Sequence, residues 1–260
     1  MQEFFHLENR AVIEITGSQT KQFLQGLITN DVSKIVEGKF MYSLMLTPQG
    51  RFLYDFFITE QGDKLLIDCQ KSKVEDIIKK LNMYKLRAQV AILPTELQVY
   101  AAFSRIDQGF AADPRNDKMG FRSLRALLPD SPSASFDHYE LKRIELLIPD
   151  ADKDFIPERS FPLEYGSNEL NAIDYQKGCY IGQELTARTQ HRGTIRKKLC
   201  KLEFTGVAPE KGSEINSHAG HKVGIVLGSL GQMGLGLINM DDYIAHQPVN
   251  GIKVFADAVA

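Results

Sequence analysis

Residues 40–59 read FMYSLMLTPQGRFLYDFFIT and decide the fold class of this chain. Two apolar runs, at residues 40–47 and 52–59, are separated by the connection Pro48-Gln49-Gly50-Arg51. Proline and glycine in a four-residue connection between runs rich in aromatic and branched residues are typical of a hairpin turn. The stretch therefore predicts two antiparallel strands.

The segments on either side extend this pattern into an alternation of strands and helices. On the N-terminal side, residues 11–16 alternate like a strand, and the apolar spacing at 23–28 predicts a helix. On the C-terminal side we expect a strand at 64–69, an amphipathic helix at 71–84, and further strands at 88–93 and 97–103. The alternation predicts an α+β fold, with an antiparallel sheet that carries helices on one face.

The second half of the chain has a different pattern of expected elements, with a long irregular interval and short strands. We expect a strand at 121–128, a linker-like stretch at 129–133, a helix from about residue 136 to Pro149, and a long irregular interval at 150–171. From about Gly193 onward, short glycine-punctuated strands without a clear helix predict a small β-barrel or sandwich. The sequence therefore predicts an α+β body at residues 1–192 and a C-terminal β domain at residues 193–260.

Bulk composition excludes several classes of protein. A length of 260 residues with 43% hydrophobic and 25% charged residues fits a globular protein of two or three domains. A net charge of −2 gives no global reason to expect nucleic-acid or membrane binding. The cysteines Cys69, Cys179 and Cys200 lie too far apart in the sequence for a C-x-x-C pair and suit a reducing compartment. With no signal pattern at the N-terminus and no apolar run of about 20 residues, we expect a cytoplasmic protein.

Residues 177–184, KGCYIGQE, are the strongest candidate for chemistry. A cysteine beside a cation and near a helix N-terminus can be more acidic than a free thiol, so Cys179 is a candidate nucleophile, redox centre or soft ligand. Lys177 is the cation that would tune this thiol, and Gly178 and Gly182 would allow a sharp loop. The alternative is a small buried cysteine in a tight turn.

A basic cluster follows this motif, and it favours either a solvated surface or a site for an anion such as phosphate or a polyglutamate tail. Its members are Arg188, His191, Arg192, Arg196, Lys197 and Lys198. Two other patterns predict no site. The glycines at 231–236 are not followed by a helix and indicate a hairpin, and His218 and His221 have no third partner for a metal.

The KGCYIGQE segment, followed by Ala187-Arg188 and Arg192-Gly193, resembles the signature of the YgfZ family. These are folate-binding proteins related to the aminomethyltransferase, or T-protein, of the glycine cleavage system. Segments at 23–31, 46–51, 143–145, 161–164 and 224–229 also match in the expected order. The resemblance spans nearly the whole chain and is weaker from about 95 to 135.

The resemblance implies a three-part, T-protein-like fold of antiparallel sheets and helices around a central cavity that takes tetrahydrofolate. In this fold we expect two interleaved subdomains in the body at residues 1–192, followed by a small C-terminal β-barrel. It also implies a role in the assembly or repair of iron–sulfur clusters, especially in [4Fe–4S] enzymes, with an indirect effect on tRNA modification in bacteria. The implied partners are a reduced folate and iron–sulfur client or assembly proteins, with no direct nucleic acid and no membrane.

The resemblance also carries individual residues. Asp55 matches the second of two adjacent aspartates in T-proteins, which is a catalytic candidate beside the folate nitrogens, whereas Tyr54 replaces the first. Glu145 matches a glutamate expected to hydrogen-bond the pterin ring. The alternatives are a solvent-facing strand aspartate and an exposed helix glutamate. Further implied folate contacts are Asn30, Tyr180, and the tail-binding arginines Arg188 and Arg192.

Three functions stay open at this point: iron–sulfur maintenance with Cys179 as the functional thiol, folate-dependent aminomethyl transfer with Asp55, and a non-enzymatic binding module. The chain is shorter than a typical T-protein and carries a cysteine motif that T-proteins usually lack. These two features favour iron–sulfur maintenance and leave open whether the protein is an enzyme. No metal-binding residues are predicted.

Overall fold

The computed structural model describes residues 3–107, 109–126, 135–246 and 251–256, without the side chains of residues 191 and 192. The predicted hairpin forms as β3 (Met41–Leu46) and β4 (Phe52–Gln61). These strands belong to an antiparallel sheet of order β3-β4-β5-β2-β6, completed by β5 (Lys64–Gln70), β2 (Arg10–Thr16) and β6 (Ala91–Pro94). Helices α1 (Thr20–Gln25) and α2 (Val74–Lys85) cover one face through a core that includes Leu24, Ile77 and Leu81.

A second sheet covers the other face of the first, a division that agrees with the sheets implied by the resemblance but that the strand pattern alone does not predict. Its order is β1-β7-β9-β8, formed by β1 (Phe4–His6), β7 (Gln98–Ala102), β9 (Phe121–Arg125) and β8 (Ala111–Ala112). The expectation that residues 97–103 extend a single sheet is therefore wrong. The reason is that β4 is buried along eight consecutive residues, so both of its faces need cover.

Helix α3 (Phe136–Glu145) leads from the body to a long irregular segment, as predicted, although it ends before Pro149. The predicted linker at 129–133 lies outside the described residues. The irregular segment contains one short 3-10 helix, η4 (Pro162–Tyr165), and the other 3-10 helices of the described chain are η1 (Val32–Lys34), η2 (Lys71–Lys73) and η3 (Asp117–Met119). The segment packs back on the hairpin, because the Phe52 amide donates to the Ser160 carbonyl at 2.9 Å.

The C-terminal sheet has the order β11-β12-β13-β10-β14. Its strands are β10 (Lys197–Phe204), β11 (Glu214–Asn216), β12 (Lys222–Leu230), β13 (Met233–Asn239) and β14 (Ile252–Phe255). The expectation that this part lacks a helix is wrong, since α5 (Met240–His246) follows β13. Met240 and Tyr243 on α5 pack against the core of the barrel, so tertiary burial stabilises a helix too short to be seen in the sequence.

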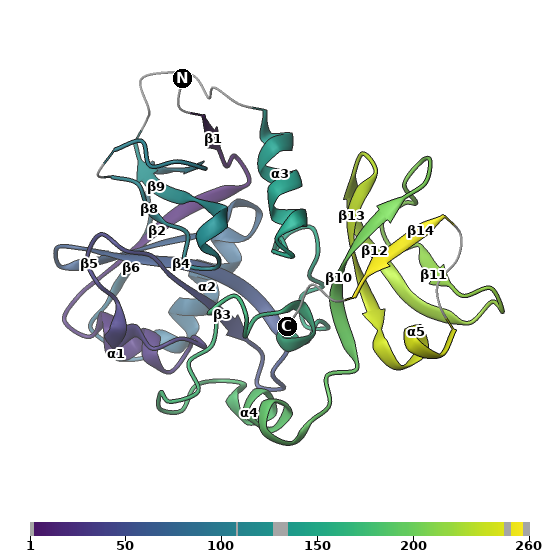
Figure 1. The fold of residues 1–260 in the computed structure, drawn as a ribbon. Helices are drawn as coiled ribbons and strands as arrows, with labels where there is room; N and C mark the ends of the chain where they lie inside the picture. The colour runs from purple at the N-terminus through teal and green to yellow at the C-terminus, as the bar shows by residue number, and fades with distance from the viewer. Residues whose placement is uncertain (1–2, 108, 127–134, 247–250, 257–260) are drawn as a thin grey trace.

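The barrel has a core of its own and also shares a core with the body. Cys200, Leu202 and Phe204 point into the barrel core. Leu227 and Leu235 belong instead to the cluster that includes residues of the body. Helix α3 contacts β12 and β13 where the body and the barrel meet. Helix α4 (Gln183–Arg192) precedes β10, and the chain passes from α4 into the barrel through this strand (Figure 1).

Candidate functional site

Residues 173–182, which we call the thiol loop, connect the irregular segment to α4 and display Cys179 to solvent. The loop lies against the residues that follow α1. The Asp174 amide donates to the Thr29 carbonyl at 3.0 Å, and the Ile181 amide donates to the Gly26 carbonyl at 3.1 Å. Cys179 is therefore an exposed residue between two backbone hydrogen bonds that hold the loop, and not the buried turn cysteine of the alternative interpretation.

Lys177 is a third anchor of the thiol loop. Its side chain is buried, and its Nζ donates to the carbonyl oxygens of Gln25 at 2.8 Å, Ile28 at 2.7 Å and Asn30 at 2.8 Å. Gln25 is the last residue of α1, where the end of a helix leaves carbonyls without partners and a cation is favourable. Burial lowers the pKa of Lys177 to about 8, so the group is still an ammonium ion at neutral pH.

The end of the thiol loop packs against the turn of the β3–β4 hairpin. Gly182 has a φ of +86°, and a Cβ at this position would lie 2.5 Å from the Thr47 carbonyl oxygen. The predicted need for glycine is confirmed here. It is wrong for Gly178, which has open space around its Cα and lies outside the left-handed region.

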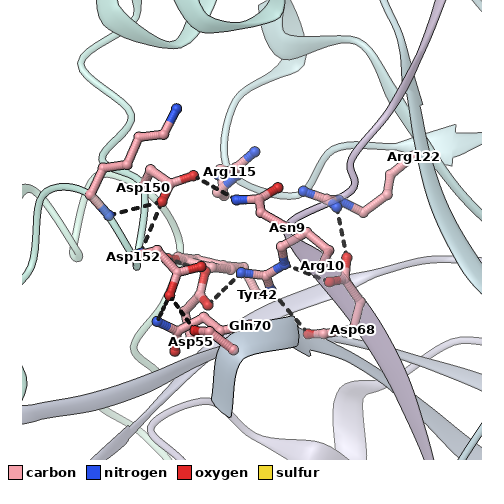
Figure 2. A network of polar contacts seen from close by, with 12 residues as sticks. Asn9, Arg10, Tyr42, Asp55, Asp68, Gln70, Arg115, Arg122, Asp150 and Asp152 are labelled. Carbon is pink, nitrogen blue, oxygen red and sulfur yellow. Dashed lines mark hydrogen bonds and ion pairs between the residues drawn. The ribbon is translucent and has the colours of Figure 1, made fainter. Parts of the chain in front are cut away.

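Asp55 lies on β4, and its carboxylate interacts with other side chains of the protein. It is 2% exposed, its Oδ1 lies 2.7 Å from Arg10 Nη1, and its Oδ2 accepts from the Tyr42 hydroxyl at 3.5 Å (Figure 2). Burial raises the pKa of Asp55, against the opposing effect of Arg10. The carboxylate is therefore neither solvent-facing nor free to meet a ligand.

The Asp55 pair belongs to a buried charge cluster, which joins the two sheets of the body. Arg10 on β2 also pairs with Asp68 on β5 at 2.7 Å, and Arg122 on β9 pairs with the same Asp68 at 2.6 Å (Figure 2). We define the charge cluster as Arg10, Asp55, Asp68, Asp113, Arg115 and Arg122, whose arginines surround the ring of Phe57.

The cavity beside Asp55 is too small for a pterin. Its volume is about 20 Å³, and it lies among charged residues including Arg10, Arg143 and Asp150. That space holds about one water molecule, whereas ligand pockets measure roughly 300–1,000 Å³. The residues around Asp55 thus do not fit a folate ring, and the expected large central cavity is filled by side chains at this point.

The other residues implied by the resemblance are scattered. Asn30 joins its surroundings by donating to the carbonyls of Tyr42 and Asn171, and Tyr180 is buried, which raises its pKa to about 12. Both lie next to Lys177, whose Nζ is 5.1 Å from the centroid of the Tyr180 ring. Glu145 and Arg188 are both exposed, and Glu145 pairs with Lys142. The side chain of Arg192 lies outside the described part of the structure.

Two larger cavities share Leu163, Glu164 and Ile195 in their linings, and we call the two cavities together the groove. They measure about 250 and 260 Å³. The first reaches α4 and the hairpin turn, and the second reaches the residues that follow α3. Burial raises the pKa of Glu164, opposed by Lys197 and Arg51. Sequence reasoning missed Glu164, although it closes the FPLE segment that carried part of the resemblance.

The described residues contain neither a metal-ligand cluster nor a membrane-spanning helix. No set of three or more histidine, cysteine, aspartate or glutamate side chains in this part of the chain is arranged to hold a metal ion. No described helix is both long enough and apolar enough to cross a bilayer.

The fold is that of the glycine cleavage T-protein class. Residues 4–100 match the model of the GCVT N-terminal domain, and residues 196–258 match the CAF17 C-terminal beta-barrel domain. The crystal structure of the glycine cleavage system aminomethyltransferase T from Bartonella henselae superposes with a TM-score of 0.76, covering 99% of this chain and 86% of that one. At 13% identity, this likeness shows the fold alone.

More similar sequences define the family within that class. The iron–sulfur cluster assembly factor IBA57 of Mus musculus is 31% identical over 80% of this chain and 68% of its own length, and that of Homo sapiens is 31% identical over 90% and 76%. The Neurospora crassa homologue is 32% identical, and the chain spans 54% of its length. The chain belongs to the IBA57 family of iron–sulfur cluster assembly factors. The resemblance to YgfZ stays an interpretation of the thiol motif.

Proposed function

We propose that this protein acts in the assembly or repair of iron–sulfur clusters, notably those of [4Fe–4S] enzymes, with Cys179 as its functional thiol. The observation that carries the proposal is that Cys179 is exposed on the thiol loop of a chain that belongs to the IBA57 family. Cys69 and Cys200 are buried, which raises the pKa of Cys69 to about 12 and that of Cys200 to about 11. Sulfur chemistry needs an accessible thiolate, so Cys179 is the cysteine suited to it.

The accessibility of Cys179 also bears on its partner. Because the thiol faces solvent, the group that reacts with it arrives from outside the chain, and an assembly or client protein of iron–sulfur enzymes is the partner we propose. An effect on tRNA modification would then be indirect, through a client enzyme that needs its cluster.

The first experiment compares cells that carry the unaltered protein, Cys179→Ala or Cys200→Ala as their only copy. We expect Cys179→Ala to lower the activity of [4Fe–4S] enzymes to the level of cells that lack the protein. Cys200→Ala, which removes a buried thiol of the barrel, is expected to keep that activity. Full activity with Cys179→Ala would contradict the assigned role of this thiol.

We further propose that a reduced folate such as tetrahydrofolate binds in the groove and not beside Asp55. The two cavities of the groove together reach the size of a ligand pocket, the first has a mostly apolar lining, and both are lined by one half-buried carboxylate, that of Glu164. A carboxylate accepts hydrogen bonds from the amino and amide edge of a pterin. The exposed Arg196 lines the first cavity and the half-buried Lys198 lines the second, and both cations suit an anionic tail.

Calorimetric titration with tetrahydrofolate under reducing conditions tests this assignment. We expect Glu164→Gln to weaken binding about tenfold or more, since a charge-assisted hydrogen bond is worth about 1.5–3 kcal/mol. Asp55→Asn, checked for native circular dichroism, should bind with nearly unchanged affinity. If Asp55→Asn weakened binding more than Glu164→Gln, the folate site would lie at Asp55 and not in the groove. If the unaltered protein bound no tetrahydrofolate, the folate proposal would be wrong, and the proposed role of Cys179 would be unaffected.

Aminomethyl transfer is the alternative function, and the geometry of Asp55 disfavours it. The aspartate that would act beside the folate nitrogens is held by Arg10 at 2.7 Å and adjoins a cavity of about 20 Å³. A catalytic carboxylate must reach its substrate within hydrogen-bond distance. No observation on the described residues favours this function over cluster assembly.

A further inference from the structure

The ammonium group of Lys177 has a complete set of partners, none of which is the neighbouring thiol. A lysine has three N–H donors, and those of Lys177 meet three carbonyl oxygens at 2.7–2.8 Å. The acceptors lie 147–152 residues earlier in the chain. The side chain therefore connects the thiol loop to the segment just after α1.

The contacts lie on both sides of Cys179. Lys177 holds the loop two residues before the thiol, and the Ile181 amide, bonded to the Gly26 carbonyl at 3.1 Å, holds it two residues after. Between them, Tyr180 is 8% exposed and packs in the shared core. The residues before and after the exposed thiol are thus held in place by contacts with the rest of the body.

We propose that Lys177 is a positioning residue for Cys179: it clamps the thiol loop onto residues 25–30, the last residue of α1 and the segment just after it, through three carbonyls and thereby fixes where the thiol is presented. This inference rests on the proposed role of Cys179. It replaces the expectation that Lys177 acts directly on the thiol. Because its donors are all engaged, its action on Cys179 runs through the backbone of the loop.

Loss of the clamp would also leave carbonyls without partners. The Ile28 carbonyl lies in a buried contact with Lys177, and a buried polar group without a hydrogen bond is costly. The segment around residue 28 would then move toward water and carry the thiol loop with it. Asp31 and Asp174, the acidic groups near the ammonium ion, favour its charged form and so support the clamp.

Two substitutions separate positioning from direct tuning of the thiol. Lys177→Met keeps an unbranched stem and removes every donor, whereas Lys177→Arg keeps the charge but presents a planar fork that cannot converge on the same three carbonyls. Lys34→Met is the matched control, since Lys34 makes an ion pair with Asp174 of the same loop but is 55% exposed.

The readouts are amide hydrogen exchange of Asp174 and Ile181 in the intact protein, and the pH profile of Cys179 alkylation by iodoacetamide. Both are measured well below the melting temperature of each variant. We expect Lys177→Met and Lys177→Arg to speed exchange at these two amides at least tenfold relative to the protein average, with an unchanged midpoint of the alkylation profile. Lys34→Met should leave both readouts unaltered.

A shift of the alkylation midpoint in Lys177→Met that Lys177→Arg restores would overturn the proposal in favour of direct tuning. Unchanged exchange at Asp174 and Ile181 in Lys177→Met would overturn it as well. Failure of the proposed function is distinguishable, because it shows as full [4Fe–4S] enzyme activity with Cys179→Ala, which neither of these readouts measures. In cells, positioning predicts that both Lys177 variants lower that activity and Lys34→Met does not.

Discussion

At the scale of the residue, two glycines of one motif have different physical roles. Gly182 has a φ of +86° and faces the Thr47 carbonyl oxygen, so a side chain there meets both strain and a clash. Gly178 is surrounded by open space and has no such constraint. The motif therefore combines one glycine required by packing with one whose requirement the conformation does not explain.

Gly182→Ala should destabilise the protein more than Gly178→Ala. For Gly182→Ala we expect a loss of about 1–3 kcal/mol in the free energy of unfolding, from backbone strain and the contact with the hairpin turn. For Gly178→Ala we expect a change within about 0.5 kcal/mol. Urea denaturation measures both values, and equal losses would contradict the contact of Gly182 with the turn.

At the scale of the element, the charge cluster joins strands that the sequence pattern does not relate. Asp68 on β5 accepts from Arg10 on β2 and from Arg122 on β9, so one carboxylate connects the two sheets of the body. A buried ion pair is weak evidence of net stability, but removal of one partner leaves uncompensated charge. We therefore expect the cluster to favour this packing of the two sheets over packings that would leave its charges unpaired.

Asp68→Asn should be among the more damaging substitutions outside the apolar core. We expect it to lower the free energy of unfolding by about 3–5 kcal/mol, because two buried arginines each lose their ion pair with Asp68. Each arginine keeps only one other carboxylate nearby, Asp55 for Arg10 and Asp113 for Arg122. Lys222→Met, which breaks the exposed pair with Glu214, should cost less than about 1 kcal/mol. Denaturant unfolding of both variants tests this, and a small loss for Asp68→Asn would mean that the cluster has another source of compensation.

At the scale of the whole molecule, body and barrel share a core. Leu227 and Leu235 of the barrel belong to one apolar cluster with Tyr139 and Ile144 of α3. A joint of this kind couples the two parts, and it also sets the position of the groove, whose lining includes Glu164 of the body and Lys198 of the barrel.

The shared core predicts a single cooperative unfolding transition. Leu227→Ala should lower the free energy of unfolding by about 2–5 kcal/mol, through lost burial and the resulting cavity. Val207→Ala, at a side chain that is 97% exposed, should change it by less than about 0.5 kcal/mol. Scanning calorimetry measures the number of transitions and the stability of both variants. Two separate transitions in the unaltered protein would show that barrel and body unfold independently.

Local patterns were enough for much of the architecture. The hairpin at 40–59, the helix after residue 71 and the irregular stretch before the thiol motif are all visible in periodicity and turn residues. The division into two sheets and the helix α5 are not, because both depend on which surfaces are covered by distant segments. Periodicity reports that a face is buried and is silent about what buries it.

The same distinction applies to the site. By itself, the sequence determined the strand-turn-strand unit, the barrel-like C-terminal part and the motif that contains Cys179. Only the tertiary structure decided that Cys179 is exposed while Cys69 and Cys200 are buried, that Asp55 pairs with Arg10, and that Lys177 meets carbonyls near residue 28. Turns and amphipathic strands arise from neighbours in the chain, whereas a buried charge takes its partner from whatever the folded core brings within hydrogen-bond distance.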